Sequence, residues 1–513
     1  MGFRQLVGQG PPISGRDQPQ WRRVLSVLLL TLLAFLNLAD RFSLAGVLVR
    51  IQEFYAINDS MAGLLQTVYI LAYVGFSLLV AVLGDRMNRK WLILIANSAW
   101  VGLMIASSFV PESAFGAFMA LRSLLSCGNA FTNGLVIALI GDWFEDRSRG
   151  YAMMVYYWSL PVGSSIGIIV SSVLVEAGVH WQWILRICPV LGAVVLVLIL
   201  CFVQEPLRGG MESDPAALGA SPTTIAGIWS DVKAIFRVKS YLSVVLAMAA
   251  NNFVLVSAAW WTPLLVLQAL AFQSAESGAT TFHGQSYSLI QTLIGVVIAF
   301  GGIAGGSLAV WIAQNWKEGR MCFSRIQTVR AFPLVGAIGS LFAFPSAMLL
   351  QPSLGWDIFL VYFLNFYNSV LPSGNPVMAM DVLMEVIPSS RRASATSILY
   401  VFAFLLGDCP GPYIAGSISD AIRAGKEDPE SRFYALVNAL YATSSLFSVC
   451  IAAFFAAAYF MKNERLSSPT EDKVPVVIED DVEMTKLPEK VNVLGIEERP
   501  GDRRRDDHTA SDE

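Results

Sequence analysis

The sequence predicts an all-α membrane protein in which twelve spanning helices form two six-helix bundles. Of its 513 residues, 55% are hydrophobic and only 14% are charged, whereas soluble domains carry about a quarter charged residues. The hydrophobic residues gather in runs long enough to cross a bilayer, which takes about 20 helical residues. We expect spans at residues 24–50, 60–83, 91–110, 114–141, 150–176, 182–203, 240–270, 286–314, 328–350, 356–386, 393–421 and 432–461.

The distribution of basic residues predicts the orientation of these spans. Lysine and arginine concentrate in every second loop, for example at Arg86, Arg89 and Lys90 after the second span and at Lys317 and Arg320 after the eighth. Cytosolic loops of membrane proteins are enriched in these residues. With an even number of spans, both termini are therefore expected in the cytosol. The polar start of the chain does not read as a cleavable signal.

Composition divides the chain into five parts. We expect an N-terminal cytosolic segment at 1–23, a first bundle at 24–203, a cytosolic linker at 204–239 and a second bundle at 240–462. The remainder, 463–513, is polar and mixed in charge, which predicts a disordered cytosolic tail.

Several function classes are not expected. The six cysteines and three histidines lack metal-ligand spacing, so we expect no metal site and no cofactor. The chain has no phosphate-binding loop motif and no credible nucleophile–base constellation, so we expect neither ATP hydrolysis nor another enzyme activity. The net charge of −4 argues against a nucleic-acid partner.

A repeated charge pattern closes the fourth and tenth spans. Asp142 precedes Arg149 in "GDWFEDRSRGYA", and Asp381 precedes Arg391 and Arg392 in "MDVLMEVIPSSRRASA". We expect these residues to form charge pairs between the two halves. Internal repeats are typical of secondary transporters, which place their substrate near the middle of the membrane between the halves.

The loop after the second span, "AVLGDRMNRK", carries an acid and a basic cluster. It resembles the G-x-x-x-D-R-x-G-R-R/K loop of the major facilitator superfamily, with Ala81 and Asn88 in place of two glycines. The resemblance implies a cytosolic latch for alternating access; the alternative is an anchor that only sets the topology. The latch residues would be Gly84, Asp85, Arg86, Arg89 and Lys90. The matching loop of the second half lacks the Asp-Arg pair.

A narrower resemblance rests on motifs that occur in order between about residues 24 and 460. The chain resembles the Spinster branch of that superfamily, in which Asn88 is usual. This implies a twelve-helix exporter of lysophospholipids or sphingosine phosphate, in the lysosomal or plasma membrane. The motifs are "NLADRFSLAGVL", "GLLQTVYI", "GDRMNRK", "LPVGSSIG", "HWQWILRICPVLG", "QEPLRG", "AWWTP" and "SSRRASATSILYVFAFLLGDCPGPYIAGSISD".

Charged residues inside the spans mark the candidate substrate and gating site. Asp40 and Arg122 fall at similar depth on the first and fourth spans, so we expect them to pair. Arg41 is rotated by about 100° from Asp40 and must snorkel or join a second network. The functional interpretation gives Arg122 the lipid head group and Asp40 a proton; the alternative is a fixed structural ion pair.

Two further positions belong to this site. The resemblance implies a glutamate two turns after Arg122, but the chain has Asn129, which cannot titrate and leaves Asp40 as the main titratable group of the first half. Asp408 precedes Pro410 and Pro412, and it either lines a cavity or caps the helix break that these prolines cause.

The sequence thus predicts a monomeric secondary transporter of lysophospholipids or sphingoid lipids that works by alternating access, with proton linkage as an option. Its expected partner is a membrane lipid with a polar head group. Two alternatives are a transporter of a small polar organic solute and a non-transporting scaffold or sensor with the same fold.

Overall fold

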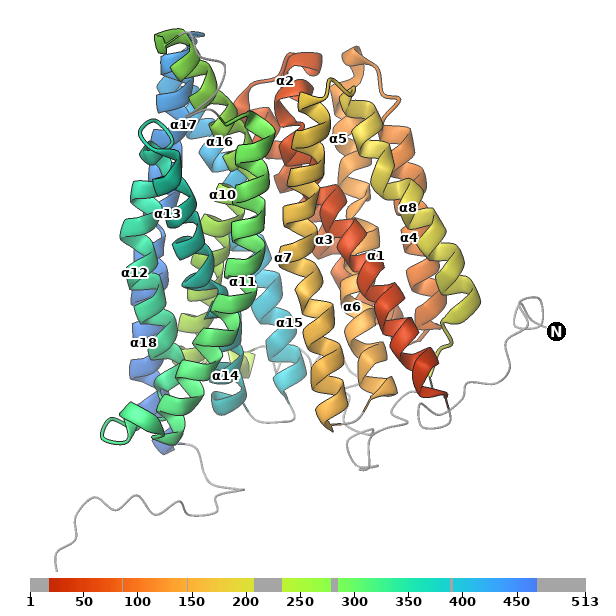
Figure 1. Cartoon of the computed structure of the whole chain (residues 1–513). Helices are drawn as coiled ribbons and strands as arrows, with labels where there is room; N and C mark the ends of the chain where they lie inside the picture. Colours follow the sequence, from red (N-terminus) through yellow and green to blue (C-terminus); the bar gives the residue numbers. More distant parts are fainter. Residues whose placement is uncertain are drawn as a thin grey trace, which may run out of the picture. The chain divides into compact units, whose positions relative to one another are not determined.

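Long apolar helices run side by side in two groups, red to yellow for the first half of the chain and green to blue for the second (Figure 1). The computed structural model describes residues 18–84, 86–144, 146–206, 233–277, 285–387 and 391–467. The start of the predicted N-terminal segment, Asp85, most of the predicted linker and nearly all of the predicted tail lie outside the described residues.

In the part of the chain that the structure describes, the first half contains eight α-helices and a short 3₁₀ turn. They are α1 (Gln20–Gly46), α2 (Leu48–Tyr55), α3 (Asp59–Leu83), α4 (Arg89–Ser107), η1 (Glu112–Ala114), α5 (Phe115–Leu124), α6 (Ser126–Trp143), α7 (Asp146–Glu176) and α8 (Trp181–Phe202).

The second half is also helical, with more interruptions. Its elements are α10 (Lys239–Ser277), α11 (Tyr287–Glu318), η3 (Met321–Phe323), α12 (Ala331–Ser353), α13 (Ile358–Val370), η4 (Pro372–Gly374), α14 (Asn375–Val386), α15 (Arg392–Ala403), η6 (Phe404–Asp408), α16 (Pro410–Arg423), α17 (Pro429–Ser444) and α18 (Phe447–Ser467).

The membrane spans agree with the sequence prediction except at one place. Among the described residues, 11 helices are long and apolar enough to cross a membrane. The predicted span 356–386 is instead broken into α13, η4 and α14. Pro372 begins the break because a proline inside a helix removes one backbone hydrogen bond and crowds the preceding turn. The protein is an all-α integral membrane protein.

The break expected near Pro410 takes a specific form. Residues Phe404–Asp408 form a π-helical turn, and Pro410 then begins α16. Proline is favourable at that position because the first helical N–H has no partner within the helix. Single π-turns inside α-helices often mark functional sites, and this one ends on Asp408.

Helix starts are fixed by side-chain caps. The side chains of Asn58, Asn88, Ser286, Asp357 and Asp428 each accept a hydrogen bond from a backbone N–H of the first helical turn. Such caps satisfy N–H groups that have no partner within the helix. Asn88, the departure in the predicted latch loop, is therefore the cap of α4.

The helix bundles have two ends, called here the terminal side and the far side. The terminal side is the end at which α1 begins and α18 finishes; the far side is the end at which α2 and α16 finish (Figure 1). The halves contact one another mainly through two helix pairs, α3 with α16 and α7 with α11.

The buried apolar residues show where the halves are joined. The largest cluster runs from the first half into the far-side ends of α10, α13 and α17, and includes Leu48, Trp261, Val361 and Leu436. Two smaller clusters lie entirely within the second half. The continuous core therefore crosses between the halves at the far side.

Glycines allow this close approach. A β-carbon at Gly63 of α3 would lie 2.4 Å from the Pro412 carbonyl oxygen, and one at Gly416 of α16 would lie 2.4 Å from the Asp59 carbonyl oxygen. Both distances are too short for any side chain. Small residues at helix contacts are the usual means of packing backbones closely in membranes.

Candidate functional site

Asp40 and Arg122 lie together inside the first half. Their exposed fractions are 2% each, and Arg122 Nη1 is 3.7 Å from Asp40 Oδ1. The other carboxylate oxygen, Oδ2, accepts a hydrogen bond of 3.0 Å from the indole N–H of Trp100. The structure thus brings together the pair expected from depth alone and adds a third member on α4.

The position of Trp100 is determined by two glycines. β-Carbons at Gly128 of α6 and Gly192 of α8 would lie 2.8 Å and 2.4 Å from Trp100 carbon atoms. The indole therefore fills a slot that only glycine leaves open, and it directs its N–H at Asp40. Because Trp100 takes one carboxylate oxygen, Arg122 meets only the other.

Arg122 keeps unused hydrogen-bonding capacity. Its Nη1 donates to the Met104 sulfur at 2.8 Å, a weak acceptor, and its Nε has no hydrogen-bond partner among the described residues. Asp40 Oδ1 likewise accepts no hydrogen bond within that part of the chain. Buried polar atoms are nearly always paired, so these atoms are suited to an additional ligand.

Arg41 joins a second network, which links the two halves. Its Nη2 lies 3.7 Å from Asp408 Oδ2, and both side chains are largely buried. With its amide oxygen turned toward Arg41, Gln66 accepts hydrogen bonds at 2.9 Å from Nε and 2.5 Å from Nη2. The guanidinium also lies 5.4 Å from the ring centre of Tyr69, a cation–π distance.

The halves also meet through the backbone beside this pair. The Thr67 hydroxyl of α3 donates to the Cys409 carbonyl oxygen at 2.5 Å. The π-turn ends one residue earlier, so the irregular segment of the second half is held against α3. Asp408 therefore pairs across the halves, and α16 has no side-chain cap among the described residues.

A chain of neutral groups leads away from Arg41. The Asn129 amide donates to the Tyr69 hydroxyl at 3.3 Å and accepts from Asn133 at 3.0 Å. Asn133 in turn accepts from Tyr156 at 2.8 Å and donates to Tyr73 at 3.4 Å. Asn129 thus connects the charged site to a row of amides and phenols that can bind polar groups without changing charge.

The predicted latch residues take several roles on the terminal side. Gly84 ends α3 and Arg86 is exposed. Arg89 forms an ion pair with Asp142 of α6, and the Lys90 amine donates to the Leu200 carbonyl oxygen at the end of α8 at 2.8 Å. Asp85 lies outside the described residues.

Among the described residues, the two acids of the expected charge pairs form ion pairs with residues other than the predicted arginines. Asp142 meets Arg89, and Asp381 lies 3.3 Å from Lys317 at the end of α11, so each acid has an ion-pair partner in its own half. The reason is that α6 and α14 pack within their own bundles, whereas the halves join at the far side. Lys317 thus pairs with Asp381 in the second half, as Arg89 pairs with Asp142 in the first.

Two of the remaining basic residues of that repeat contact their own half. A β-carbon at Gly141 would lie 3.5 Å from Arg149 Nη2. Arg392 donates to the Met384 and Ile387 carbonyl oxygens at the end of α14, which favours a cation. Arg391 lies just before α15.

Sequence reasoning missed three residues of the site. Trp100, Gln66 and Tyr69 are uncharged, so a search for charges inside spans passes over them. Gln66 does carry a signal, since a lone amide within the apolar third helix needs a buried partner. Trp100 carries none, because its slot depends on glycines of two other helices.

Comparison with known proteins is consistent with this architecture. Residues 30–412 match the Major Facilitator Superfamily. Protein spinster homolog 1 of Bos taurus is 32% identical over 470 residues, covering 88% of this chain and 86% of the relative. The chain is a member of the Spinster branch of the major facilitator superfamily. This confirms the resemblance and the fold class predicted from the sequence.

Two further relatives extend the comparison. The sphingosine-1-phosphate transporter SPNS2 of Mus musculus is 32% identical over 432 residues, covering 84% of this chain and 76% of the relative. A crystal structure of a bacterial homologue of the human lysosomal transporter Spinster, inward-facing and unoccupied, superposes with a TM-score of 0.71. It is 18% identical and covers 88% of this Spinster protein and 100% of that chain, which shows a shared fold.

Proposed function

We propose that this protein moves lysophospholipids or sphingoid phosphates across a membrane by alternating access, with the head group bound between Arg122 and Arg41. The observation that carries the proposal is that each buried arginine meets a single carboxylate oxygen at 3.7 Å. Charge-assisted N–H···O bonds are about 2.7–2.9 Å long, so neither carboxylate satisfies its arginine. A phosphate offers several oxygens to the planar guanidinium and is the better ligand.

The charge of the site supports a phosphate-bearing lipid. Asp40, Asp408, Arg41 and Arg122 form two ion pairs, and the neighbouring Asn129 network is neutral. A phosphate head group that replaces one carboxylate at its arginine gains a positively charged partner. The displaced aspartate then has no ion-pair partner. The name of the mouse relative, a sphingosine-1-phosphate transporter, agrees with this chemistry.

Binding of two lipids that differ by one phosphate tests the proposal. We expect the purified protein to bind sphingosine phosphate about 100-fold more tightly than sphingosine, because two hydrogen bonds to a charged group are each worth about 1.5 kcal/mol or more. Fluorescence or calorimetric titration in detergent measures the ratio, and Arg122→Gln should remove most of it. Equal affinities would contradict the proposal and turn attention to polar solutes or a scaffold role.

Proton linkage belongs to the same proposal, with Asp40 as the group that carries the proton. When the head group takes Arg122, Asp40 keeps only its hydrogen bond to Trp100 and gains from protonation. We expect Asp40→Asn to make lipid flux independent of a pH gradient, measured in liposomes with either face acidic. A gradient dependence that survives in Asp40→Asn would place the proton elsewhere.

The orientation and location are also proposals. The terminal side carries Arg23, Arg89, Lys90 and Lys317, so we assign it and both termini to the cytosol. Under this assignment the conformation described here is closed toward the exterior or lumen. We further propose a lysosomal or plasma membrane location and a working monomer; the bacterial relative is named as a homologue of a human lysosomal transporter.

A further inference from the structure

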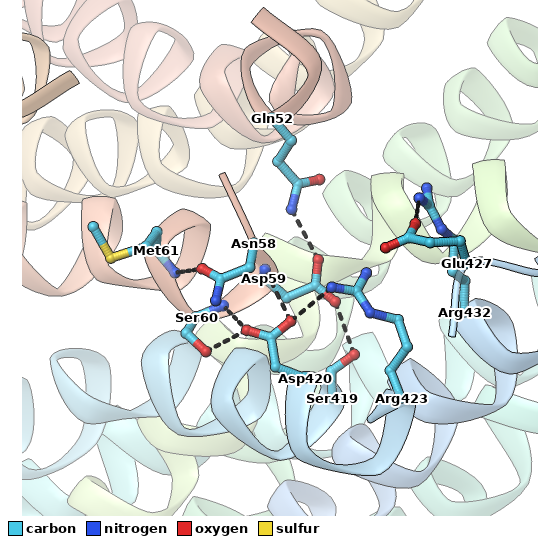
Figure 2. A network of polar contacts seen from close by, with 10 residues as sticks. All are labelled: Gln52, Asn58, Asp59, Ser60, Met61, Ser419, Asp420, Arg423, Glu427 and Arg432. Atoms are coloured by element: carbon cyan, nitrogen blue, oxygen red, sulfur yellow. Dashed lines mark hydrogen bonds and ion pairs between the residues drawn. The ribbon is translucent and has the colours of Figure 1, made fainter. Parts of the chain in front are cut away.

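An acid of the second half caps the start of α3 at the far side (Figure 2). The Asp420 carboxylate, near the end of α16, accepts the backbone N–H groups of Asp59 at 3.2 Å and Ser60 at 2.7 Å. The Ser60 hydroxyl donates to the same carboxylate. A carboxylate at a helix N-terminus satisfies unpaired N–H groups and meets the positive end of the helix dipole.

The contact is reinforced by residues of α16 and α2. The Ser419 hydroxyl of α16 donates to Asp59 Oδ2 at 2.8 Å, and the Gln52 amide donates to Asp59 Oδ1 at 2.8 Å. Arg423 lies 3.1 Å from Asp420 and balances part of the charge of the two acids (Figure 2). All these bonds lie where Gly63 and Gly416 let α3 and α16 touch.

The other interface between the halves repeats this arrangement. Glu176, the last residue of α7, accepts the Ser288 N–H at 2.6 Å at the start of α11. The hydroxyls of Ser286 and Ser288 lie 3.3 Å apart at the same helix start. Ser60 and Ser288 are each the second residue of their helix and follow a capping residue by two positions. The two contacts therefore have the same chemistry in opposite directions between the halves.

Acid caps on the terminal side behave differently. Glu464 of α18 caps the start of α10, accepting the Lys239 N–H at 2.5 Å, and Glu205 accepts the Arg89 N–H at 3.1 Å. Each of these contacts stays within one half. The same type of bond thus crosses between the halves at the far side and not at these two terminal-side caps.

We propose that Asp420 on α3 and Glu176 on α11 form a double gate that holds the far side closed, and that both contacts break when it opens. The inference rests on the proposed alternating access. Asp420 contributes more than Glu176 to the stability of the closed far side. The Asp420 side chain is only 17% exposed, whereas Glu176 is exposed to solvent, where water weakens a charge–dipole contact. Loss of the charge at both sites favours the far-side-open state.

Spin-label distances across the far side test the gate. Labels are placed at Val179 and Glu430, exposed positions in different halves, after Cys201 and Cys322 are replaced by serine. We expect Asp420→Asn to increase the population of long distances several-fold and Asp420→Asn with Glu176→Gln to increase it by about tenfold. Glu464→Gln, which removes a helix-start acid within one half, is the matched control and should leave the distances unchanged.

A second variant opens the same contact without changing charge. Gly63→Ala places a methyl group against Pro412 and should also lengthen the distances, whereas Gly75→Ala meets nothing within 4 Å and should not. Unchanged distances in both the double acid variant and Gly63→Ala would overturn the gate, as would an equal shift in Glu464→Gln. Distances that shift in a protein that moves no lipid would keep the gate and overturn only the proposed substrate.

Discussion

Arg122→Ala is expected to reduce lipid transport at least about 100-fold. The substitution removes the planar donor that we assign to the phosphate, and two hydrogen bonds to a charged group are together worth about 3 kcal/mol or more. Initial rates of labelled sphingosine phosphate uptake into liposomes measure the effect. Arg122→Lys keeps the positive charge but loses the planar guanidinium that binds two oxygens at once. Its transport rate should therefore lie between those of the wild-type protein and Arg122→Ala.

Loss of activity in Arg122→Ala must be separated from loss of stability. The variant leaves Asp40 buried with only Trp100 as a partner, and breaking a buried ion pair on one side costs about 3–5 kcal/mol. Adding Asp40→Asn removes the unpaired charge and should recover stability but not transport. Arg320→Ala, at an exposed arginine, is the matched control. Normal uptake by a folded Arg122→Ala variant would contradict the assignment.

Asp408→Asn is expected to lower the KM for lipid severalfold and to lower the turnover rate about tenfold. Asp408 competes with the head group for Arg41, so the neutral side chain leaves that arginine more available. The same pair joins the halves, and its exchange for the substrate is the step that links binding to movement. A substrate that stays bound to Arg41 without a competitor is released slowly.

The opposite substitution separates this mechanism from simple damage. Arg41→Gln removes the ligand rather than its competitor, so we expect KM to rise at least tenfold. Concentration series of uptake in liposomes give KM and turnover for both variants. Arg50→Ala, an arginine of the far-side surface, is the control. A higher KM in Asp408→Asn would show that Asp408 helps to bind the lipid instead of competing with it.

The residues differ in how far their sequence positions could reveal their roles. The pairing of Asp40 with Arg122 could be predicted because each residue lies within one unbroken helix, α1 or α5, where depth follows from residue counts. Arg41 could be placed only on a different side of its helix, because its partner Asp408 sits at the end of a π-turn whose path no residue count predicts. Contacts that depend on such irregular backbone require the structure.

Charges at helix ends were harder still to assign. The repeat around Asp142 and Asp381 was visible, but the sequence could not show that Arg89 and Lys317 would supply the partners within each half. Which ends of the bundles touch depends on the conformation, and a sequence encodes all conformations of the transport cycle at once. The predicted span 356–386 is helical over most of its length but is interrupted at Pro372, a break that length and hydropathy do not reveal.

The most direct test of the account is flux of labelled sphingosine phosphate in liposomes that contain the purified protein, Arg122→Gln or no protein. We expect the wild-type protein to move the lipid well above the rate of protein-free liposomes and Arg122→Gln to fall to that background. Background flux for the wild-type protein under a pH gradient of either sign would contradict it. So would equal flux for the wild-type protein and Arg122→Gln.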